Sequence, residues 1–358
     1  MLYPFFFFLI PFDVIHLFLG VDLKTFLVSN LLFLSTYIFV ATFSYFITHY
    51  DIRPVMKQLL VFNFILTLLA IPLYFTPWKE LVWYVNNFTL SVKELSRLSL
   101  FTFESSYYAL LFVPVAFYYL LKVFFRQNKT AAFVILLMVA LPLLLSLSLG
   151  VLAAMLLTFI SLFVLDYKKI LYRENYFFTI SGSVALCCVV LLVLFIFYPD
   201  NPVFVRVANI LQGNDSSARG RIADSFSVAW RVAGERSIWF GAGLGQVKIL
   251  VYDIVKKYFN HWGEMEVYRI PNSVAETLAI FGITGIVLRF SLIFYLFFKT
   301  RVLSNYYRTA LFIFIFIYQF TGSFITNIAE YVIWALAFSH VFPQYNLQVP
   351  EPKTTHDE

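Results

Sequence analysis

The chain has 358 residues, of which 61% are hydrophobic and only 13% are charged, and its formal net charge is +6. A soluble globular domain carries about 25% charged residues, so this composition excludes that class and predicts a protein of the lipid bilayer. The two cysteines, Cys187 and Cys188, are adjacent within an apolar stretch, which gives no support for a disulfide framework or a cysteine-based metal site.

Apolar stretches long enough to cross a membrane recur along the chain. A hydrocarbon core of about 30 Å requires roughly 17 to 25 mainly apolar residues in a helix. About ten stretches meet or approach this length, at approximately residues 3–19, 27–48, 56–75, 107–122, 131–147, 149–165, 177–198, 274–298, 309–322 and 327–342. We therefore predict an all-α, polytopic membrane protein. The first span lacks a basic flank and a small-residue cleavage site, so we expect it to stay as an anchor.

Basic residues between the spans predict the orientation. Segments 49–57, 122–129, 166–176 and 299–308 hold eleven Lys and Arg against three acids. The positive-inside bias places these segments in the cytoplasm, with both termini, and leaves residues 76–106, 146–150 and 199–271 outside. This topology explains most of the positive charge, so no nucleic-acid partner is expected.

The same topology divides one integrated domain into regions. Residues 1–198 form an N-terminal membrane region of about seven helices, and residues 272–342 a C-terminal one of about three. A large, partly helical outer loop over 199–271 separates them, and residues 343–358 form a cytoplasmic tail.

Glu104 lies in "RLSLFTFESSYYALL", residues 97–111, immediately before the predicted fourth span. An ionisable group at that depth is costly unless it faces a wet cavity or a partner. Glu104 is therefore a candidate catalytic carboxylate, although a structural ion pair with Arg97 explains it equally well. Glu330, beside Tyr331 and Trp334 in the last predicted span, is a weaker candidate of the same kind.

Two helical patterns occur in the outer segment 199–271. The first is an apolar face at three- to four-residue spacing, formed by Ile222, Phe226, Ala229, Trp230 and Ala233. The second is an apolar stripe formed by Val247, Leu250, Val251, Ile254, Val255 and Tyr258. Three lysines lie off this second stripe, a pattern typical of a helix in the membrane interface.

Arg219 and Arg221 fall at the start of the first of these outer helices, where the helix dipole is already positive and disfavours a cation. Free backbone N–H groups and guanidinium forks together favour phosphate, so these arginines are candidates for an anion site. Alternatively, both arginines are solvated or form ion pairs with Asp215 and Asp224.

Two further motifs follow in the outer segment. "GAGLG", residues 241–245, lacks the GxGxxG spacing and the βαβ unit of a nucleotide loop, so we predict a turn that needs positive φ or close backbone approach. In "RIPNSVAETLAIFGITG", residues 269–285, Asn272 and Glu276 share a helix face near the outer mouth of the eighth span. They are either a polar pair facing water or, for Asn272, a group that orients a sugar or phosphate.

Together these motifs resemble the bacterial O-antigen polymerase (Wzy) and O-antigen ligase superfamily. The likeness covers about residues 97–335 and rests on "SSAR" or "ARGR" followed by "WFGAGLG", on "PNSVAETLAIFGITG", on "FTFESSYYALL" and on "SLSLGVLAAM". The sequence departs from the family pattern twice. Pro271 replaces the histidine that precedes the asparagine in ligases, and Ser105 replaces the proline of a Glu-Pro-Ser-Tyr element.

The resemblance implies a glycosyltransferase in the bacterial inner (plasma) membrane. The substrate would be an undecaprenyl-diphosphate-linked oligosaccharide, and the acceptor of a repeat-unit polymerase would be a sugar hydroxyl of another lipid-linked unit at the outer face. A chain-length regulator and a flippase of the same pathway would be partners. A ligase that moves finished glycan is the second hypothesis, and a flippase the third.

The expected site residues follow from this chemistry. Arg219 and Arg221, with Arg269 behind them, would stabilise the leaving diphosphate, and Glu104, or else Glu276, would accept the proton of the acceptor hydroxyl. Asn272, Ser217, Gly241 and Gly243 complete the predicted substrate-binding set. No His, Asp or Glu cluster has metal-ligand spacing in the outer segments, so we expect neither a metal nor another cofactor.

Overall fold

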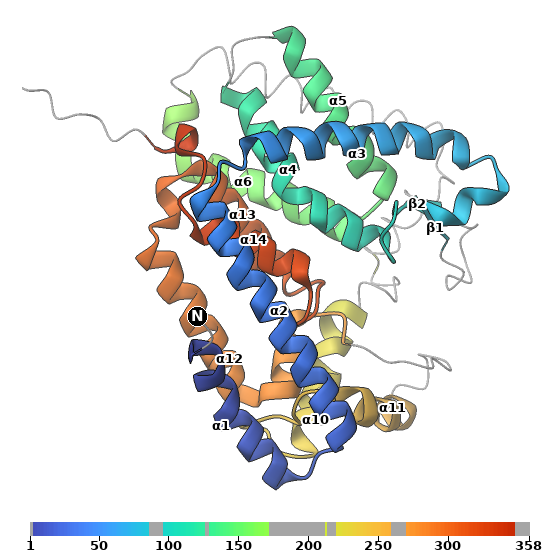
Figure 1. Cartoon of the computed structure of the whole chain (residues 1–358), viewed down its shortest axis with the longest axis vertical. Coiled ribbons are helices and arrows are strands. Elements are labelled where there is room, and N and C mark those ends of the chain that lie inside the picture. The colour runs from blue at the N-terminus through green and yellow to red at the C-terminus, as the bar shows by residue number, and fades with distance from the viewer. Residues whose placement is uncertain are drawn as a thin grey trace, which may run out of the picture.

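The computed structural model describes residues 3–85, 96–125, 129–171, 212, 220–258 and 270–347. This part of the chain is almost entirely helical (Figure 1). Its α-helices are α1 (Tyr3–Leu19), α2 (Leu23–His49), α3 (Arg53–Leu73), α4 (Ser105–Phe125), α5 (Lys129–Ser146), α6 (Leu149–Leu171), α10 (Ser225–Gly234), α11 (Val247–Tyr258), α12 (Ser273–Lys299), α13 (Tyr306–Tyr318) and α14 (Ile328–Phe338). A π-helical turn, Gly220–Asp224, precedes α10, and β1 (Trp83–Val85) pairs antiparallel with β2 (Ser96–Leu98).

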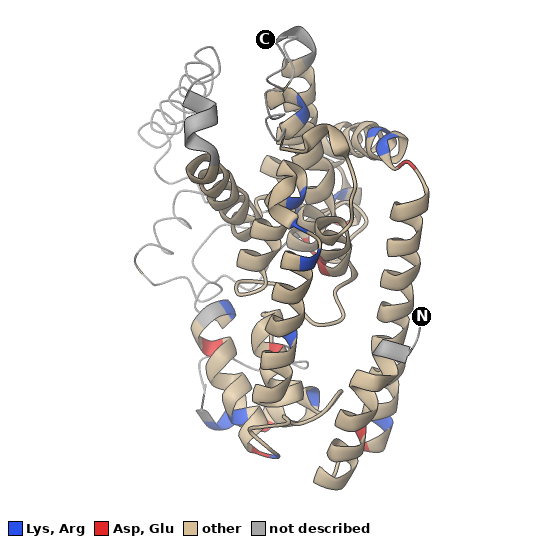
Figure 2. Ribbon diagram, turned by 90° about the vertical axis from the view of Figure 1, so that its left-hand side faces the viewer, with Lys and Arg blue, Asp and Glu red and all other residues tan. Residues whose placement is uncertain are grey.

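The apolar helices lie where the spans are predicted. Within the described residues, four helices, α2, α3, α4 and α12, are long and apolar enough to cross a membrane. Five shorter apolar helices, α1, α5, α6, α13 and α14, coincide with other predicted spans. Charged residues gather near helix ends, and long stretches of helix carry none (Figure 2). The all-α membrane class is thus confirmed, while the predicted span 177–198 lies outside the described residues.

Two apolar cores hold the helices together. One lies among α4, α6, α13 and α14, where Phe117, Leu311 and Phe314 are completely buried. The other joins α1, α2 and α12 to α10 and α11. The predicted outer helices therefore pack onto the bundle, which fixes the turn that precedes α10.

The apolar faces of α10 and α11 pack against the rest of the protein. In α11, Val251, Ile254 and Val255 are buried in the core shared with α10, so this part of the stripe contacts protein rather than lipid. In α10 the buried face contains Val228 and Val232, and Trp230 is 55% exposed. Ala229 and Ala233 of the predicted apolar face are buried, whereas Trp230, at the edge of that face, is largely exposed.

Loops that the prediction places on one side contact one another. On the predicted outer side, Asp22 N–H donates to Gln246 Oε1 at 2.9 Å, and Arg236 Nη1 donates to Leu19 O at 2.8 Å. On the predicted inner side, the Tyr345 hydroxyl donates to Tyr118 O at 2.9 Å. These contacts agree with the alternation of the spans; the assignment of the inner side to the cytoplasm stays a prediction.

Helix α12 is not continuous. Gly282 has φ 66° and ψ −163°, a conformation that is open essentially to glycine alone. The predicted span 274–298 is thus interrupted, and a short first segment, 273–281, precedes a longer second segment, 283–299. Figure 1 shows the short segment running across the direction of the longer one.

The "GAGLG" loop replaces the backbone hydrogen bonds that this break removes. The carbonyls of Ala279 and Ile280 accept from Ala242 N–H at 2.8 Å and Gly243 N–H at 3.0 Å. In return, Ile283 and Thr284 N–H donate to the carbonyls of Ile238 and Trp239, both at 3.0 Å. An apolar environment offers no water for such groups, so the loop and the broken helix satisfy each other.

Glycine is required on both sides of this contact. Gly241 has φ 77°, and a Cβ there would lie 2.4 Å from the carbonyl atoms of Ile280. A Cβ on Gly282 would meet the carbonyl atoms of Trp239 at the same distance. The prediction of positive φ or close approach in "GAGLG" is confirmed in both respects.

We predict that Gly241→Ala destabilises the folded protein by at least about 2 kcal/mol, because the added methyl group forces backbone apart and strains a positive φ. Thermal unfolding of the purified protein in detergent measures the effect. Gly234→Ala is the matched control, since no atom lies within 4 Å of its added Cβ. Equal unfolding temperatures for the two variants would contradict the close contact.

Candidate functional site

Glu104 immediately precedes α4, at its N-terminal end, which the topology predicts to lie outside. Its carbonyl accepts from Tyr108 N–H at 3.1 Å and from the Thr102 hydroxyl at 2.9 Å. Its carboxylate accepts from the Ser106 hydroxyl, with 2.5 Å between the Ser106 and Glu104 oxygens. A negative charge at a helix N-terminus interacts favourably with the helix dipole, so this position suits an ionised carboxylate.

Arg221 reaches this carboxylate from the turn before α10. Its Nη2 lies 3.3 Å from Glu104 Oε1, although the two residues are 117 positions apart in the sequence. The side chains are 28% and 27% exposed, so the pair is partly buried yet open on one side. Glu104 therefore forms its ion pair with Arg221 rather than with Arg97, whose guanidinium lies over the Tyr84 ring in the β-hairpin.

The guanidinium of Arg221 retains capacity for another anion. Arginine has five N–H donors in a planar fork. Among the described residues, only Glu104 accepts from one of them. The remaining donors suit a phosphate oxygen, which arginine binds with short, charge-assisted hydrogen bonds.

Asn272 fixes the main chain at Arg221. Its Oδ1 caps the start of α12 by accepting from Val274 N–H at 3.1 Å and Ala275 N–H at 2.9 Å. Its Nδ2 donates to Arg221 O at 3.0 Å and to Phe320 O at 2.5 Å. The side chain is completely buried, so in the structure Asn272 joins three elements and faces no water.

Glu276 lies one turn further along α12. Its Oε2 accepts from Ile325 N–H, in the loop between α13 and α14, at 2.6 Å. Glu276 thus helps to attach this loop to the start of α12. Its role as an alternative base stays a prediction.

The remaining predicted site residues are two glycines of the "GAGLG" loop and three residues of the outer segment. Gly241 and Gly243 belong to the contact with the α12 break, where their N–H groups donate to Ser237 O and Ile280 O. Their role in substrate binding stays a prediction. Arg219, Ser217 and Arg269 lie outside the described residues.

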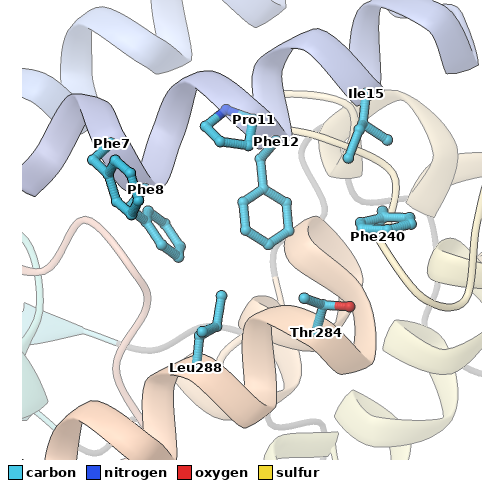
Figure 3. Close-up of a pocket in the computed structure, with 8 residues that line it drawn as sticks. All are labelled: Phe7, Phe8, Pro11, Phe12, Ile15, Phe240, Thr284 and Leu288. Carbon is cyan, nitrogen blue, oxygen red and sulfur yellow. The ribbon is translucent and has the colours of Figure 1, made fainter.

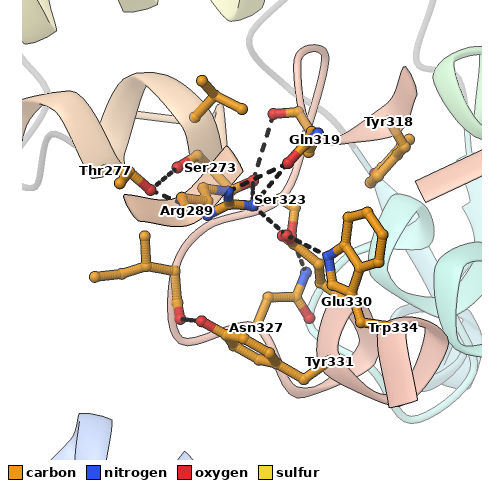
Figure 4. Close-up of polar contacts among 12 residues, drawn as sticks. Ser273, Thr277, Arg289, Tyr318, Gln319, Ser323, Asn327, Glu330, Tyr331 and Trp334 are labelled. Atoms are coloured by element: carbon orange, nitrogen blue, oxygen red, sulfur yellow. Dashed lines mark hydrogen bonds and ion pairs between the residues drawn. The ribbon is translucent and has the colours of Figure 1, made fainter. Parts of the chain in front are cut away.

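Sequence reasoning missed a partly buried arginine near the site. Arg289, in the second segment of α12, forms an ion pair with Glu330 of α14 at 2.6 Å and contacts Gln319, Ser273 and Thr277 (Figure 4). The signal was present, because Arg289 is the only charged residue between Glu276 and Lys299 in the predicted eighth span. A charge within a span is by default a functional candidate.

An apolar groove lies elsewhere, between α1 and the second segment of α12 (Figure 3). Its volume is about 380 Å³, and it is lined by Phe7, Phe8, Pro11, Phe12, Ile15, Phe240, Thr284 and Leu288. This lining has no charge to hold a phosphate. Within the described residues, the region around Glu104 and Arg221 combines partial exposure with charge of both signs, which suits a diphosphate.

The comparison with protein families now decides the class. Residues 131–290 match the family model described as O-antigen ligase. This match identifies a domain of the O-antigen ligase/polymerase superfamily at residues 131–290. No curated protein matches the sequence. The superfamily supports a glycosyltransferase-like membrane enzyme with lipid-linked glycan substrates, and the match includes Arg221 and Asn272.

We predict that Asn272→Asp destabilises the protein by about 1 to 3 kcal/mol, because the buried carbonyls of Arg221 and Phe320 lose their donor while the cap oxygen is kept. Unfolding in detergent measures this. Asn327→Asp is the matched control: Asn327 caps α14, but its Nδ2 donates to the Ser323 hydroxyl, which can rotate and donate to a carboxylate instead. An equal loss in the control would show that the effect comes from a carboxylate at a helix cap and not from the lost donor to the two carbonyls.

Proposed function

We propose that this member of the superfamily is a polysaccharide repeat-unit polymerase. It transfers glycan from an undecaprenyl-diphosphate-linked donor to a sugar hydroxyl of a lipid-linked acceptor at the outer face of the bacterial plasma membrane. The single observation that carries the proposal is the partly exposed pair of Glu104 and Arg221 at the outer end of α4. A carboxylate and a guanidinium in one open site are the two groups that the reaction requires.

Arg221 binds the leaving diphosphate in this mechanism. As the bond between the anomeric carbon and the diphosphate oxygen breaks, negative charge grows on that oxygen. A donor already in place for such charge typically contributes about 3 kcal/mol to the transition state. Arg219 and Arg269 are proposed to add donors from the same outer loop, with Ser217, Gly241 and Gly243 as further substrate contacts.

Glu104 accepts the proton of the acceptor hydroxyl. The hydroxyl oxygen attacks the anomeric carbon, its proton passes to the carboxylate, and the diphosphate leaves as the anion. The Ser106 hydroxyl and Arg221 both contact Oε1, so they orient the carboxylate. Positioned bases of this kind contribute roughly 10² to 10⁴ in rate.

A ligase is the second candidate. The description of the matching family as O-antigen ligase favours it, whereas Pro271 at the position of the ligase histidine favours the polymerase. The donor chemistry is the same for both, and only the acceptor differs. A chain-length regulator and a flippase of the same pathway are the proposed partners.

Replacing Arg221 by Ala should reduce polymerisation at least about 10²-fold, because a preorganised donor to the leaving group is lost. Glu104→Gln should reduce it by roughly 10² to 10⁴ through loss of the base. A gel of surface glycan from a deletion strain that expresses each variant measures this as the loss of long chains, with single repeats still on the final acceptor.

Lys248→Ala is the control for loss of one outer positive charge, since Lys248 lies exposed on α11, and it should keep the wild-type ladder. Long chains in both Arg221→Ala and Glu104→Gln would refute the assigned roles. Loss of all glycan from the acceptor, with long lipid-linked polymer accumulating, would favour the ligase instead.

We predict that a chelator leaves the activity unchanged, since the energy of transfer lies in the glycosyl diphosphate bond and Arg221 supplies positive charge without a metal. Membrane vesicles that contain the full chain and lipid-linked repeat units, with and without EDTA, provide the measurement. Activity abolished by EDTA and restored by a divalent cation would contradict metal independence.

A further inference from the structure

The partly buried Arg289 makes contacts that a straight helix would forbid. Ser273 and Arg289 would lie about 24 Å apart along a continuous α-helix, at about 1.5 Å per residue. Because α12 breaks at Gly282, the Arg289 guanidinium instead lies 3.1 Å from Ser273 Oγ and 3.0 Å from Thr277 Oγ1. Arg289 therefore ties the second segment of α12 back onto the first.

The same guanidinium also holds the two neighbouring helices. Its Nη2 lies 2.6 Å from Glu330 Oε1, at the start of α14, and 3.0 Å from Gln319 Oε1, at the end of α13 (Figure 4). The Trp334 indole N–H donates to the same Glu330 oxygen at 3.3 Å. The Arg289 side chain thus links both α12 segments, α13 and α14.

These contacts lead directly to the proposed catalytic pair. Ser273, which Arg289 contacts, follows Asn272, and its N–H donates to Gly322 O in the turn after α13. Asn272 then holds the carbonyls of Phe320 and Arg221. The path from Arg289 to the Arg221 main chain therefore passes through only two consecutive residues, Ser273 and Asn272.

Stability alone does not account for the ion pair. A buried pair costs desolvation, and apolar residues of similar volume in its place are often neutral or stabilising. Glu330 is only 2% exposed, and its Oε2 has no hydrogen-bond partner among the described residues, which adds a further cost. Such a pair is better suited to specifying one geometry than to stabilising the fold.

We propose that Arg289, oriented by Glu330, is a positioning residue for glycan transfer: it holds the N-terminal segment of α12 so that Arg221 and Glu104 keep their reactive geometry. This inference rests on the proposed function. A misplacement of the reacting groups lowers the rate of the chemical step more than it weakens substrate binding.

The test uses the full chain in membrane vesicles, with lipid-linked repeat units extracted from cells that lack this protein. The double variant Arg289→Met, Glu330→Met should unfold at or above the wild-type temperature, since it removes a buried ion pair. Its kcat should fall at least ten-fold, with KM changed less than three-fold. Hydrogen exchange at residues 273–275 should become faster.

Arg308→Met is the matched control. Arg308 is also an arginine within the helix bundle and is more deeply buried, but it donates to Ala337 O and Thr300 O on the predicted inner side. Its loss should lower the unfolding temperature and leave kcat per folded molecule unchanged. Arg289→Lys keeps the charge without the planar fork, so its kcat should lie between those of the wild type and the double variant.

Wild-type kcat in the double variant, or in Arg289→Lys should the double variant fail to fold, would overturn the inference while leaving the proposed function standing. Absence of polymer from the wild-type chain would instead refute the proposed function. In that case unchanged hydrogen exchange at residues 273–275 would refute the positioning role independently.

Discussion

The backbone exchange between the "GAGLG" loop and the break in α12 is the constraint on which the rest of the structure depends. A helix that breaks in apolar surroundings exposes N–H and C=O groups that water cannot satisfy. Here Ala242 and Gly243 donate to Ala279 and Ile280, and the N–H groups of Ile283 and Thr284 donate to the loop in return. The exchange requires main chain to approach main chain, and Gly241 and Gly282 allow it. The "GAGLG" loop is thereby attached to a long apolar helix by backbone hydrogen bonds that no side chain supplies.

The break places the start of α12 where it can organise the outer site. Asn272 caps this start and holds the Arg221 carbonyl, and Arg221 in turn pairs with Glu104 on α4. The Arg289 guanidinium holds the same segment by donating hydrogen bonds to the Ser273 and Thr277 hydroxyls. Segments far apart in the sequence thus form one polar region at the outer ends of apolar helices. Its chemistry agrees with a superfamily whose substrates are lipid-linked glycans.

Much of this arrangement could be predicted from the sequence, for physical reasons. Apolar stretches of sufficient length fix the helices, and the two outer helices follow from their periodicity. Glu104, Arg221 and Asn272 each attract attention because a charge or amide near a membrane is costly without a purpose. Their contacts could not be predicted, since a pairing across 117 residues depends on the fold. The break at Gly282 was also hidden, because glycine is common in transmembrane helices, and the backbone partners that permit a break come from a distant loop. Trp230 is exposed although it shares a predicted apolar face with the buried Ala229 and Ala233, because spacing alone does not fix which side of a short helix meets the core.

The central claim is that Arg221, held at the α12 start, binds the diphosphate of the lipid carrier beside Glu104. A cryo-EM structure of the full chain in a lipid nanodisc with undecaprenyl diphosphate tests it most directly. The account predicts diphosphate density within about 3 Å of the Arg221 guanidinium, the range of a charge-assisted hydrogen bond, with the α12 start still held by Asn272. Diphosphate density away from this pair, at the inner ends of the helices or along the apolar groove of α1, would contradict it.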